Sequence, residues 1–468
     1  MTGDGRPSGV TGPPRRAAGH AVVVGGGLAG LTAAVRLADT GVRVTLFEAR
    51  PRLGGATHSF FRDGLVIDNG QHVFLRCYTA YQGFLRRLGT VDSTTVQERF
   101  MVPVIGPGGR CGRLRRSTLP APLHLASSLL RYRLLDPADR LRVARAALRL
   151  RSLDPDNPAL DRLGFGQWLG EQGQTRECVR AMWEPFTVSA LNLPVAEASL
   201  ALAAKVFRTG MLSSTDAADI GFPLVSLEDL HARPAAALLR RAGGQVAVSA
   251  KVTGVRPVGR GGLEVIVDGH TIVADAVVLA VPHQAATRLL PPRAVVGGAG
   301  FDGLSAEPIV NLHVVYDRQV TGLAFAAAVG SPVQWVFDRN HVAGMPRRDG
   351  QYLAVSLSAA SRYVDTPTAR LREEFLPALE QLFARARGAR VRSFFVTRER
   401  RATFRQAPDS HRLRPAPVTA VPGLLLAGSW TDTGWPDVME GAVRSGEEAA
   451  RLASAYLAGI RTEAEVTG

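Results

Sequence analysis

One glycine-rich turn constrains the fold of this chain more than any other feature. The turn reads Gly25-x-Gly27-x-x-Gly30; a β-branched run over 21–24 leads into it, and apolar residues at helical spacing follow over 31–38. The first glycine allows a tight turn, the second lets a pyrophosphate approach the backbone, and the third lets helix and strand pack closely. The helix N-terminus would offer unpaired N–H groups and a positive dipole end to that pyrophosphate.

The residues after this helix complete a dinucleotide-binding unit. A second apolar strand is predicted over 42–47, and Glu48 stands at its end. A carboxylate there is placed to accept hydrogen bonds from an adenosine ribose. Strand, turn, helix, strand and acid occur in the required order, so the sequence predicts an α/β, Rossmann-like domain that binds a dinucleotide. The motif alone leaves both FAD and NAD open.

Composition limits the partners of the chain. The 468 residues carry a net charge of +15, and only Lys205 and Lys251 are lysines. A basic balance favours nucleic acid or an anionic membrane as partner. The sequence contains no zinc-finger spacing, aromatic RNA platform or long basic run, so we expect no nucleic-acid partner. The three cysteines lie far apart and predict neither a disulfide framework nor a metal site.

Two further properties bear on location. Residues 1–19 are rich in Gly, Pro and Arg and predict a disordered segment. No apolar stretch approaches the length of a membrane-spanning helix. We therefore expect a soluble or peripheral protein.

A dense polar stretch follows a predicted strand pair. The pair covers 59–67 with its turn at Asp63-Gly64, and it leads into Asp68-Asn-Gly-Gln-His72. Polar residues this dense after an apolar strand are typical of a loop presented to a site. The alternative is an Asx turn that caps the helix predicted to begin near Tyr78.

The region 96–215 is predicted to be mostly helical, with a leucine-rich segment over 119–135. Asp136 would cap a second helix, which has an apolar stripe beside an arginine stripe. This pattern suits an interfacial helix on anionic lipid, and it equally suits a surface helix whose leucines face the core. The apolar stripe is Leu141, Ala144 and Leu148, and the basic stripe is Arg142, Arg145 and Arg149.

The quoted motifs resemble those of a known family. The glycine turn, Glu48 and the pair Gly54-Gly55 resemble the extended FAD fingerprint of the amine oxidase and phytoene desaturase superfamily, which favours FAD over NAD. Three other stretches resemble the hydroxysqualene dehydroxylases of bacterial hopanoid synthesis, and the resemblance spans residues 20–455. These stretches are Asp68 to His72, Arg401 to Phe404, and Trp430 to Pro436 followed by Glu440 to Gly446.

The resemblance implies a glutathione-reductase-type FAD-binding domain interleaved with an α+β substrate domain. The FAD-binding domain would comprise 20–95, 216–300 and 406–468, and the substrate domain 96–215 and 301–405. A helix predicted from Val438 would aim its N-terminal dipole at the flavin N1–C2=O region. The residues expected at FAD are Gly25, Gly27, Leu28, Ala29, Gly30, Glu48, Ala49, Arg50, Arg52, Gly54, Gly55, Gly70, Gln71, His72, Val252, Gly428, Ser429, Val438, Met439 and Ala442.

One position departs from the family pattern. Many relatives have Asp where this chain has Ser429, and that acid binds a ribityl hydroxyl of FAD. A serine can still form hydrogen bonds but brings no charge. The departure bears on how tightly FAD binds more than on whether FAD is the cofactor.

The reaction implied by the resemblance is reduction of hydroxysqualene to squalene. An allylic hydroxyl must leave as water, which requires a proton donor, and hydride comes from reduced FAD. Asp68, His72, Asp432 and Asp437 are the candidate donors, and His72 with Asp432 is the preferred pair. The expected partners are an isoprenoid substrate, an electron donor that the sequence does not identify, and an anionic membrane surface, which the resemblance places at the inner, cytoplasmic face of the bacterial membrane. The sequence leaves the oligomeric state open.

Three other functions share this fold. A carotenoid-type desaturase would run the flavin oxidatively, and a lipid-binding escort would keep the fold without catalysis. An amine oxidase is disfavoured because neither Lys205 nor Lys251 lies in a flavin-facing motif.

Overall fold

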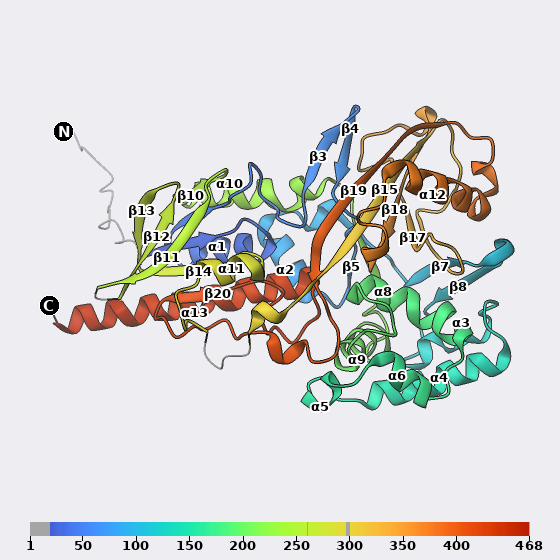
Figure 1. The fold of residues 1–468 in the computed structure, drawn as a ribbon, viewed down its shortest axis with the longest axis horizontal. Helices are drawn as coiled ribbons and strands as arrows, with labels where there is room; N and C mark the ends of the chain where they lie inside the picture. Colours follow the sequence, from blue (N-terminus) through green and yellow to red (C-terminus); the bar gives the residue numbers. More distant parts are fainter. Residues whose placement is uncertain (1–18, 260, 296–299, 468) are drawn as a thin grey trace, which may run out of the picture.

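The computed structural model describes residues 19–259, 261–295 and 300–467, with side chains as far as Ile460. The predicted disordered segment 1–19 lies outside the described residues except for Gly19. The molecule is elongated, with a parallel sheet in one half and a larger, mostly antiparallel sheet in the other (Figure 1).

The first half is built on a five-stranded parallel sheet of order β10-β2-β1-β14-β20. The predicted strand, turn, helix, strand unit forms its centre, so the Rossmann-like fold is confirmed. Its strands are β1 (His20–Val24), β2 (Arg43–Phe47), β10 (Gln245–Ala247), β14 (Ala276–Leu279) and β20 (Leu424–Leu426).

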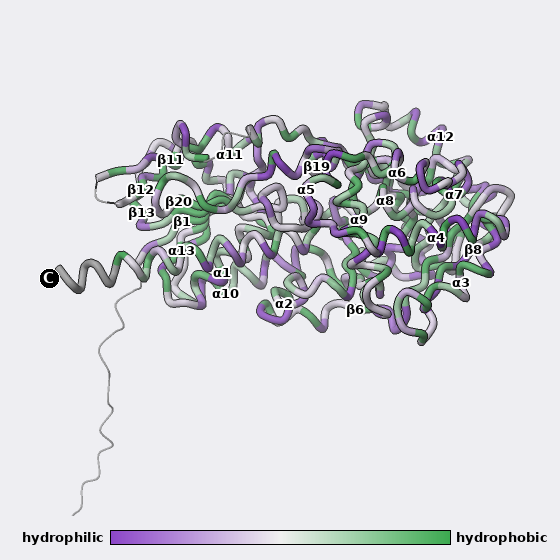
Figure 2. The backbone as a smooth tube through the Cα atoms, turned by 90° about the horizontal axis from the view of Figure 1, so that it is seen from below, coloured by the Kyte–Doolittle hydropathy of each residue, from purple (hydrophilic) through white to green (hydrophobic). Residues whose placement is uncertain are grey.

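Both faces of this sheet are covered. Ala21 and Val23 of β1 pack with α1 (Leu28–Asp39) and α13 (Met439–Thr467) on one face, and Val22 and Val24 pack under the β-meander on the other. Alternate residues of a strand point to opposite faces, so a continuous apolar run is required here. Figure 2 shows this hydrophobic centre in green along β1 and β20. The meander is β11 (Val252–Val258), β12 (Gly262–Val267) and β13 (His270–Ala274).

The β-branched stretch 271–281 does not form one continuous strand. It is divided into β13 and β14, because Asp275 breaks the run and its carboxylate accepts a hydrogen bond from the His20 backbone N–H at 2.8 Å. The leucine-rich segment 119–135 also contains less helix than its composition suggests, with one α-helix at α3 (Ala126–Leu130). Pro120 and Pro122 stand before this helix and cannot continue a helical hydrogen-bond ladder.

The second half is built on a seven-stranded sheet of order β19-β15-β18-β17-β16-β7-β8. The long strand β19 runs with β15 from this sheet toward the parallel sheet (Figure 1). The strands are β7 (Met101–Ile105), β8 (Cys111–Arg115), β15 (Ala306–Tyr316), β16 (Phe325–Ala328), β17 (Trp335–Asp338), β18 (Gln351–Leu357) and β19 (Val391–Phe404), and α12 (Thr368–Leu382) packs against them.

Smaller elements connect the two sheets. A hairpin with its turn at Asp63-Gly64 is confirmed, and helices α3 to α9 gather below the seven-stranded sheet in Figure 1. The remaining elements are β3 (Ser59–Arg62), β4 (Leu65–Asp68), β5 (Phe74–Leu75), α2 (Thr79–Leu88), β6 (Thr94–Val96), α4 (Pro137–Ser152), α5 (Pro158–Asp161), α6 (Phe165–Glu171), α7 (Arg176–Cys178), α8 (Glu184–Leu191), α9 (Leu200–Phe207), β9 (Ile220–Pro223), α10 (Arg233–Arg241) and α11 (His283–Leu289).

Among the described residues, no helix is long and apolar enough to cross a membrane. The same part of the chain contains no group of three or more His, Cys, Asp or Glu side chains that could hold a metal ion.

Candidate functional site

The glycine turn, Glu48 and Gly54-Gly55 meet at the end of β1. The Glu48 carboxylate is buried and accepts hydrogen bonds from the backbone N–H of Gly26 at 2.7 Å and of Arg50 at 2.8 Å. Gly27 is the N-cap of α1 and makes no side-chain hydrogen bond to the first turn. The N–H groups of Leu28, Ala29 and Gly30 therefore form the kind of helix end that binds a phosphate.

The second glycine pair packs directly on the first turn. The Gly54 N–H donates to the Gly26 carbonyl at 2.8 Å. Gly55 has a φ of +56°, and a Cβ at this residue would come within 2.8 Å of the Gly27 Cα. A side chain at Gly30 would come within 1.9 Å of the Gly25 carbonyl oxygen. Glycine at these positions lets three backbone segments approach one another around the end of the helix.

The other residues predicted at this end of the cofactor have different surroundings. Ala49, Arg50 and Arg52 are exposed, and Arg52 Nη2 lies 2.9 Å from Nε2 of His58. The strand β11, which begins at Val252, starts beside Glu48 because the Ala250 N–H donates to the Glu48 carbonyl at 2.9 Å.

Asp68 is held by an ion pair inside the protein. Its Oδ2 lies 2.5 Å from Nη2 of Arg339, and its Oδ1 accepts hydrogen bonds from the Ser59 hydroxyl at 2.6 Å and the Leu227 N–H at 3.1 Å. Both side chains are buried. A carboxylate with these donors fixes three segments of the chain, so its position indicates a structural role.

Gln71 and His72 differ from Asp68 in their surroundings. Neither polar atom of the Gln71 amide has a partner among the described residues, although both are buried. The His72 ring has Nδ1 3.1 Å from the Gly70 carbonyl oxygen, and burial lowers the pKa of His72 below its ordinary value. A buried amide without partners leaves donors and acceptors for a polar ligand such as a flavin ring. The loop therefore has the chemistry expected of a cofactor contact.

The second predicted contact segment lies between β20 and α13. Gly428 has a φ of +144°, and its N–H donates to the Ser445 hydroxyl at 2.9 Å. The Asp437 carboxyl accepts a hydrogen bond from the Phe404 N–H at 2.8 Å and interacts with the Ser429 side chain. Burial raises the pKa of Asp437 above its ordinary value, although Ser429 and the nearby Arg414 act in the opposite direction. Val438, Met439 and Ala442 follow at the N-terminal end of α13.

Arg414 fixes the segment 429–433 by hydrogen bonds to its backbone and to one of its side chains. Its guanidinium donates to the Ser429 and Thr431 carbonyl oxygens, each at 3.0 Å, and to the Thr433 hydroxyl at 2.9 Å. The side chain is buried, and burial lowers the pKa of Arg414 below its ordinary value. Five hydrogen-bond donors in a planar fork allow one arginine to fix several backbone oxygens at once.

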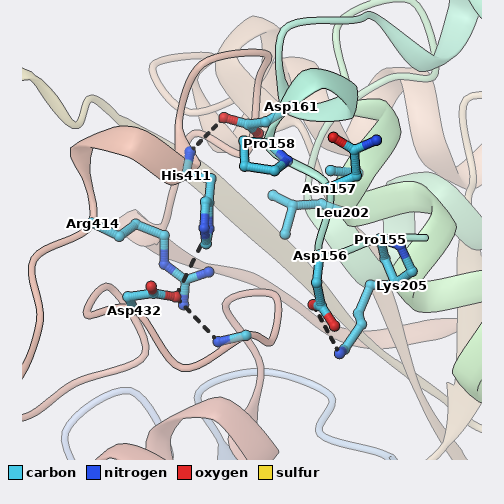
Figure 3. Close-up of a pocket in the computed structure, with 12 residues that line it drawn as sticks. Pro155, Asp156, Asn157, Pro158, Asp161, Leu202, Lys205, His411, Arg414 and Asp432 are labelled. Carbon is cyan, nitrogen blue, oxygen red and sulfur yellow. Dashed lines mark hydrogen bonds and ion pairs between the residues drawn. The ribbon is translucent and has the colours of Figure 1, made fainter.

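Asp432 occupies a different place from the other candidate acids. It is exposed and lines a pocket of about 260 Å³ with His411, Arg414 and Lys205. Figure 3 shows its carboxylate beside His411, whose Nδ1 lies 3.8 Å from Asp432 Oδ1. The two members of the preferred pair therefore have different surroundings: Asp432 lines this pocket, whereas His72 lies near the charges of Asp68 and Arg339.

The stretches 68–81 and 430–440 come together at the start of α2. The Tyr78 and Trp435 rings meet edge to face, with centroids 5.8 Å apart. The Glu440 carboxylate accepts a hydrogen bond from the Ala80 backbone N–H at 3.1 Å. His231, which sequence reasoning missed, lies in the same interior region and bonds the Tyr81 hydroxyl through Nε2 at 2.7 Å.

Arg339 and Arg414 were also missed, because neither belongs to a motif. Arg339 partners an acid 271 residues away. A buried carboxylate such as Asp68 requires a buried cation or several hydrogen-bond donors. The sequence does not show that Asp68 is buried, so this requirement could not have pointed to Arg339.

An apolar region adjoins these polar segments. Trp168, Met182 and Trp183 are buried in a core cluster with residues of α4, α6 and α9. Phe186 and Trp335 are only partly buried and meet with ring centroids 6.3 Å apart. These two are the better candidates to contact a ligand.

Comparison with known proteins agrees with this geometry. Residues 28–454 match the family described as flavin-containing amine oxidoreductase. A hydroxysqualene dehydroxylase of Rhodopseudomonas palustris is 32% identical over 92% of this chain and 97% of that protein. A zeta-carotene desaturase of Zea mays is 28% identical over 94% of this chain and 84% of that protein. The solved structure of wild-type putrescine oxidase bound to putrescine has the same fold, with a TM-score of 0.70 and 19% identity over 92% of this chain and 98% of that one.

Proposed function

Because this chain belongs to the flavin-containing amine oxidoreductases and, within them, to the hydroxysqualene dehydroxylases, we propose that it reduces hydroxysqualene to squalene. The observation that carries the proposal is the 32% identity that runs along nearly the whole length of both chains. The product would serve hopanoid synthesis.

The cofactor is FAD, and the protein is an FAD-dependent oxidoreductase. The described residues fit this cofactor at both ends. The α1 N-terminus and Glu48 suit its pyrophosphate and ribose, and the partnerless amide of Gln71 suits a polar ring. Reduced FAD, when bound, supplies the hydride that replaces the hydroxyl group of the substrate.

The protein must supply a proton so that the hydroxyl group leaves as water. A donor must be protonated near neutral pH, and burial raises the pKa of Asp437 in that direction. Burial lowers the pKa of His72, so its ring is held neutral. Asp68 is paired with Arg339, and Asp432 is exposed. Asp437 is therefore the proton donor in this proposal, and solvent returns the proton to its carboxylate after each turnover.

The apolar region serves the same reaction by excluding water. An allylic cation formed when water leaves reacts with any water in contact with it. Side chains such as Phe186 and Trp335 offer surroundings without a nucleophile. These surroundings also favour a long hydrocarbon substrate over a small amine.

The deciding experiment is a single anaerobic turnover. Flavin-reduced protein is mixed with hydroxysqualene, and flavin absorbance and product mass are followed together. We expect the flavin to reoxidise as one squalene forms per flavin. Reoxidation without squalene, or squalene without reoxidation, would contradict the proposal.

A carotene desaturase is the second candidate, because the zeta-carotene desaturase of Zea mays also matches along 94% of this chain. That activity would start from oxidised flavin and would need an electron acceptor. Zeta-carotene with a quinone acceptor should then yield products with longer conjugation, read by absorbance. An escort protein would bind the lipid and leave the flavin spectrum unchanged in both experiments.

A further inference from the structure

The segment 110–151 concentrates the positive charge of the molecule. It contains eleven arginines and two acids, a net charge of +9 from a chain total of +15. Both acids are already engaged: Asp136 caps α4 by accepting from the Asp139 N–H at 2.7 Å, and Asp139 pairs with Arg142 at 2.8 Å. One arginine, Arg116, pairs with Asp219 from outside the segment at 2.7 Å. The nine arginines other than Arg116 and Arg142 form no ion pair among the described side chains, so the segment presents an excess of positive charge.

Leucines stand exposed on the same segment. Leu141 and Leu148 are 51% and 56% exposed, and Leu130 is 68% exposed. The buried face of α4 is formed instead by Val143, Ala146 and Leu150. The sequence left open whether the leucine stripe faces the core or a membrane, and the structure places these two leucines outside. Leu119 and Leu123 are also exposed, just before α3.

The helix geometry sets leucine and arginine on one outer face. Leu141 and Leu148 are seven residues apart, or two turns, so they lie above one another. Arg145 lies between them and Arg151 lies beyond Leu148, and both are exposed without an ion pair among the described side chains. The helices α3 and α4 are in contact, at the end of the molecule opposite α13 and the meander (Figure 1).

We propose that this leucine–arginine face of segment 110–151 binds an anionic lipid bilayer. Exposed leucines flanked by arginines match an interface in which apolar side chains enter the acyl boundary and cations meet anionic headgroups. A second copy of the chain is disfavoured as occupant, since two arginine-rich faces repel each other. Nucleic acid is disfavoured because five exposed leucines stand among the arginines of this segment. The inference concerns binding alone and holds whichever isoprenoid the enzyme uses.

The test is co-sedimentation of the full-length FAD-loaded protein with vesicles. One set is made of phosphatidylglycerol and phosphatidylcholine in equal parts, and the other of phosphatidylcholine alone. We expect the wild type to bind the anionic vesicles more tightly and to dissociate as salt is raised. Leu141→Ser with Leu148→Ser should weaken binding to anionic vesicles about twentyfold, because burying the rest of a half-exposed leucine is worth roughly fivefold in affinity.

Arg145→Gln with Arg151→Gln should also weaken anionic binding about twentyfold, at roughly fivefold per arginine, and should leave binding to phosphatidylcholine unchanged. The matched controls are Val273→Ser with Val418→Ser, which are 59% and 53% exposed, and Arg256→Gln with Arg240→Gln, all outside the segment. These controls should bind as the wild type does. Retained FAD and an unchanged melting temperature show that each variant is folded.

Three results would overturn the proposal. The first is equal binding to both vesicle types, and the second is an equal loss of binding in the control variants. The third is sedimentation without vesicles that the leucine substitutions abolish, which would make the face a contact between copies of the chain.

Discussion

Glu440, in the first turn of α13, caps a different helix: its carboxylate accepts a hydrogen bond from the backbone N–H of Tyr81 in α2 at 2.9 Å. The same carboxylate accepts from the Ala80 N–H at 3.1 Å and pairs with Arg444 at 2.7 Å. It is fully buried. This acid therefore ties the segment after the polar loop 68–72 to the start of the last helix, which is where two parts of the candidate site meet.

Replacing Glu440 should destabilise the protein strongly. In Glu440→Ala two helix N–H groups lose their acceptor and Arg444 loses its partner, so the free energy of unfolding should fall by about 3 kcal/mol. Glu440→Gln keeps one acceptor oxygen and should cost about half as much. Urea denaturation measures both values. The control is Glu448→Ala on an exposed turn of the same helix, which should unfold close to wild type; equal losses in the two alanine variants would contradict the capping role.

Gly55 should be essential for FAD binding because of its contact with Gly27. A Cβ in Gly55→Ala would lie 2.8 Å from the Gly27 Cα and would push the two turns apart. We expect at least a tenfold weaker affinity for FAD, measured by quenching of flavin fluorescence. Gly64→Ala is the matched control, because Gly64 also has a positive φ, of +81°, but no atom lies within 4 Å of its Cβ position. An equal loss of FAD affinity in both variants would assign that loss to backbone strain at a positive φ and not to the contact between Gly55 and Gly27.

The features that the sequence predicted well are local in the chain. The glycine turn, Glu48 and the hairpin turn at Asp63-Gly64 each lie within a few dozen residues, and their backbone requirements are visible in residue type alone. The relationships that were missed join distant residues, such as Asp68 with Arg339 and Glu440 with Ala80, 360 residues apart. Such pairs depend on how sheets pack, which no local pattern encodes.

The outer face of α4 shows a second reason for incomplete prediction. Leu141 and Leu148 are exposed on that helix, whereas Val143, Ala146 and Leu150 face the core. Both faces of this helix contain apolar residues at helical spacing, so periodicity gave two solutions. Packing of neighbouring helices selects between them.

The ion pair of Asp68 with Arg339 should be structural. Removing the cation in Arg339→Met leaves a buried carboxylate unpaired and should lower the free energy of unfolding by about 3 to 5 kcal/mol. Adding Asp68→Asn to that variant removes the buried charge, so the double variant should recover most of the loss. Thermal and urea unfolding measure the cycle. Recovery of stability without recovery of activity would instead indicate that Asp68 takes part in the reaction.

Asp437 should give the reaction a distinctive pH dependence. A proton donor must be protonated, so the rate of flavin reoxidation by hydroxysqualene should fall as pH rises through the raised pKa of Asp437. Asp437→Asn should slow this step at least a hundredfold and remove that limb of the pH profile. An unchanged profile in the variant would transfer the role to another group.

Stability supplies an independent test of the same pKa. The pKa of Asp437 is raised in the folded protein above the value of about 3.9 in an unfolded chain, so the unfolded state loses this proton first. The stabilisation associated with the protonated carboxyl is therefore complete below about pH 4 and disappears as pH rises through the folded pKa. Asp437→Asn carries no ionisable group there. The free energy of unfolding of Asp437→Asn should therefore increase relative to that of the wild type as pH rises from about 4 through the folded pKa of Asp437.

Ser429 connects this acid to FAD affinity. The family pattern that this sequence resembles has an Asp where this chain has Ser429. Here the Ser429 side chain interacts with the Asp437 carboxyl. Ser429→Asp would set two carboxyls side by side in a buried place, so one of them must stay protonated or the pair must separate. We expect Ser429→Asp alone to weaken FAD binding severalfold, and Ser429→Asp with Asp437→Asn to restore or exceed wild-type affinity. Flavin fluorescence titration of the four proteins gives the coupling between the two positions. Additive effects would show that the two side chains act on FAD separately, whereas a coupling would show that Asp437 partly replaces the acid that this chain lacks at 429.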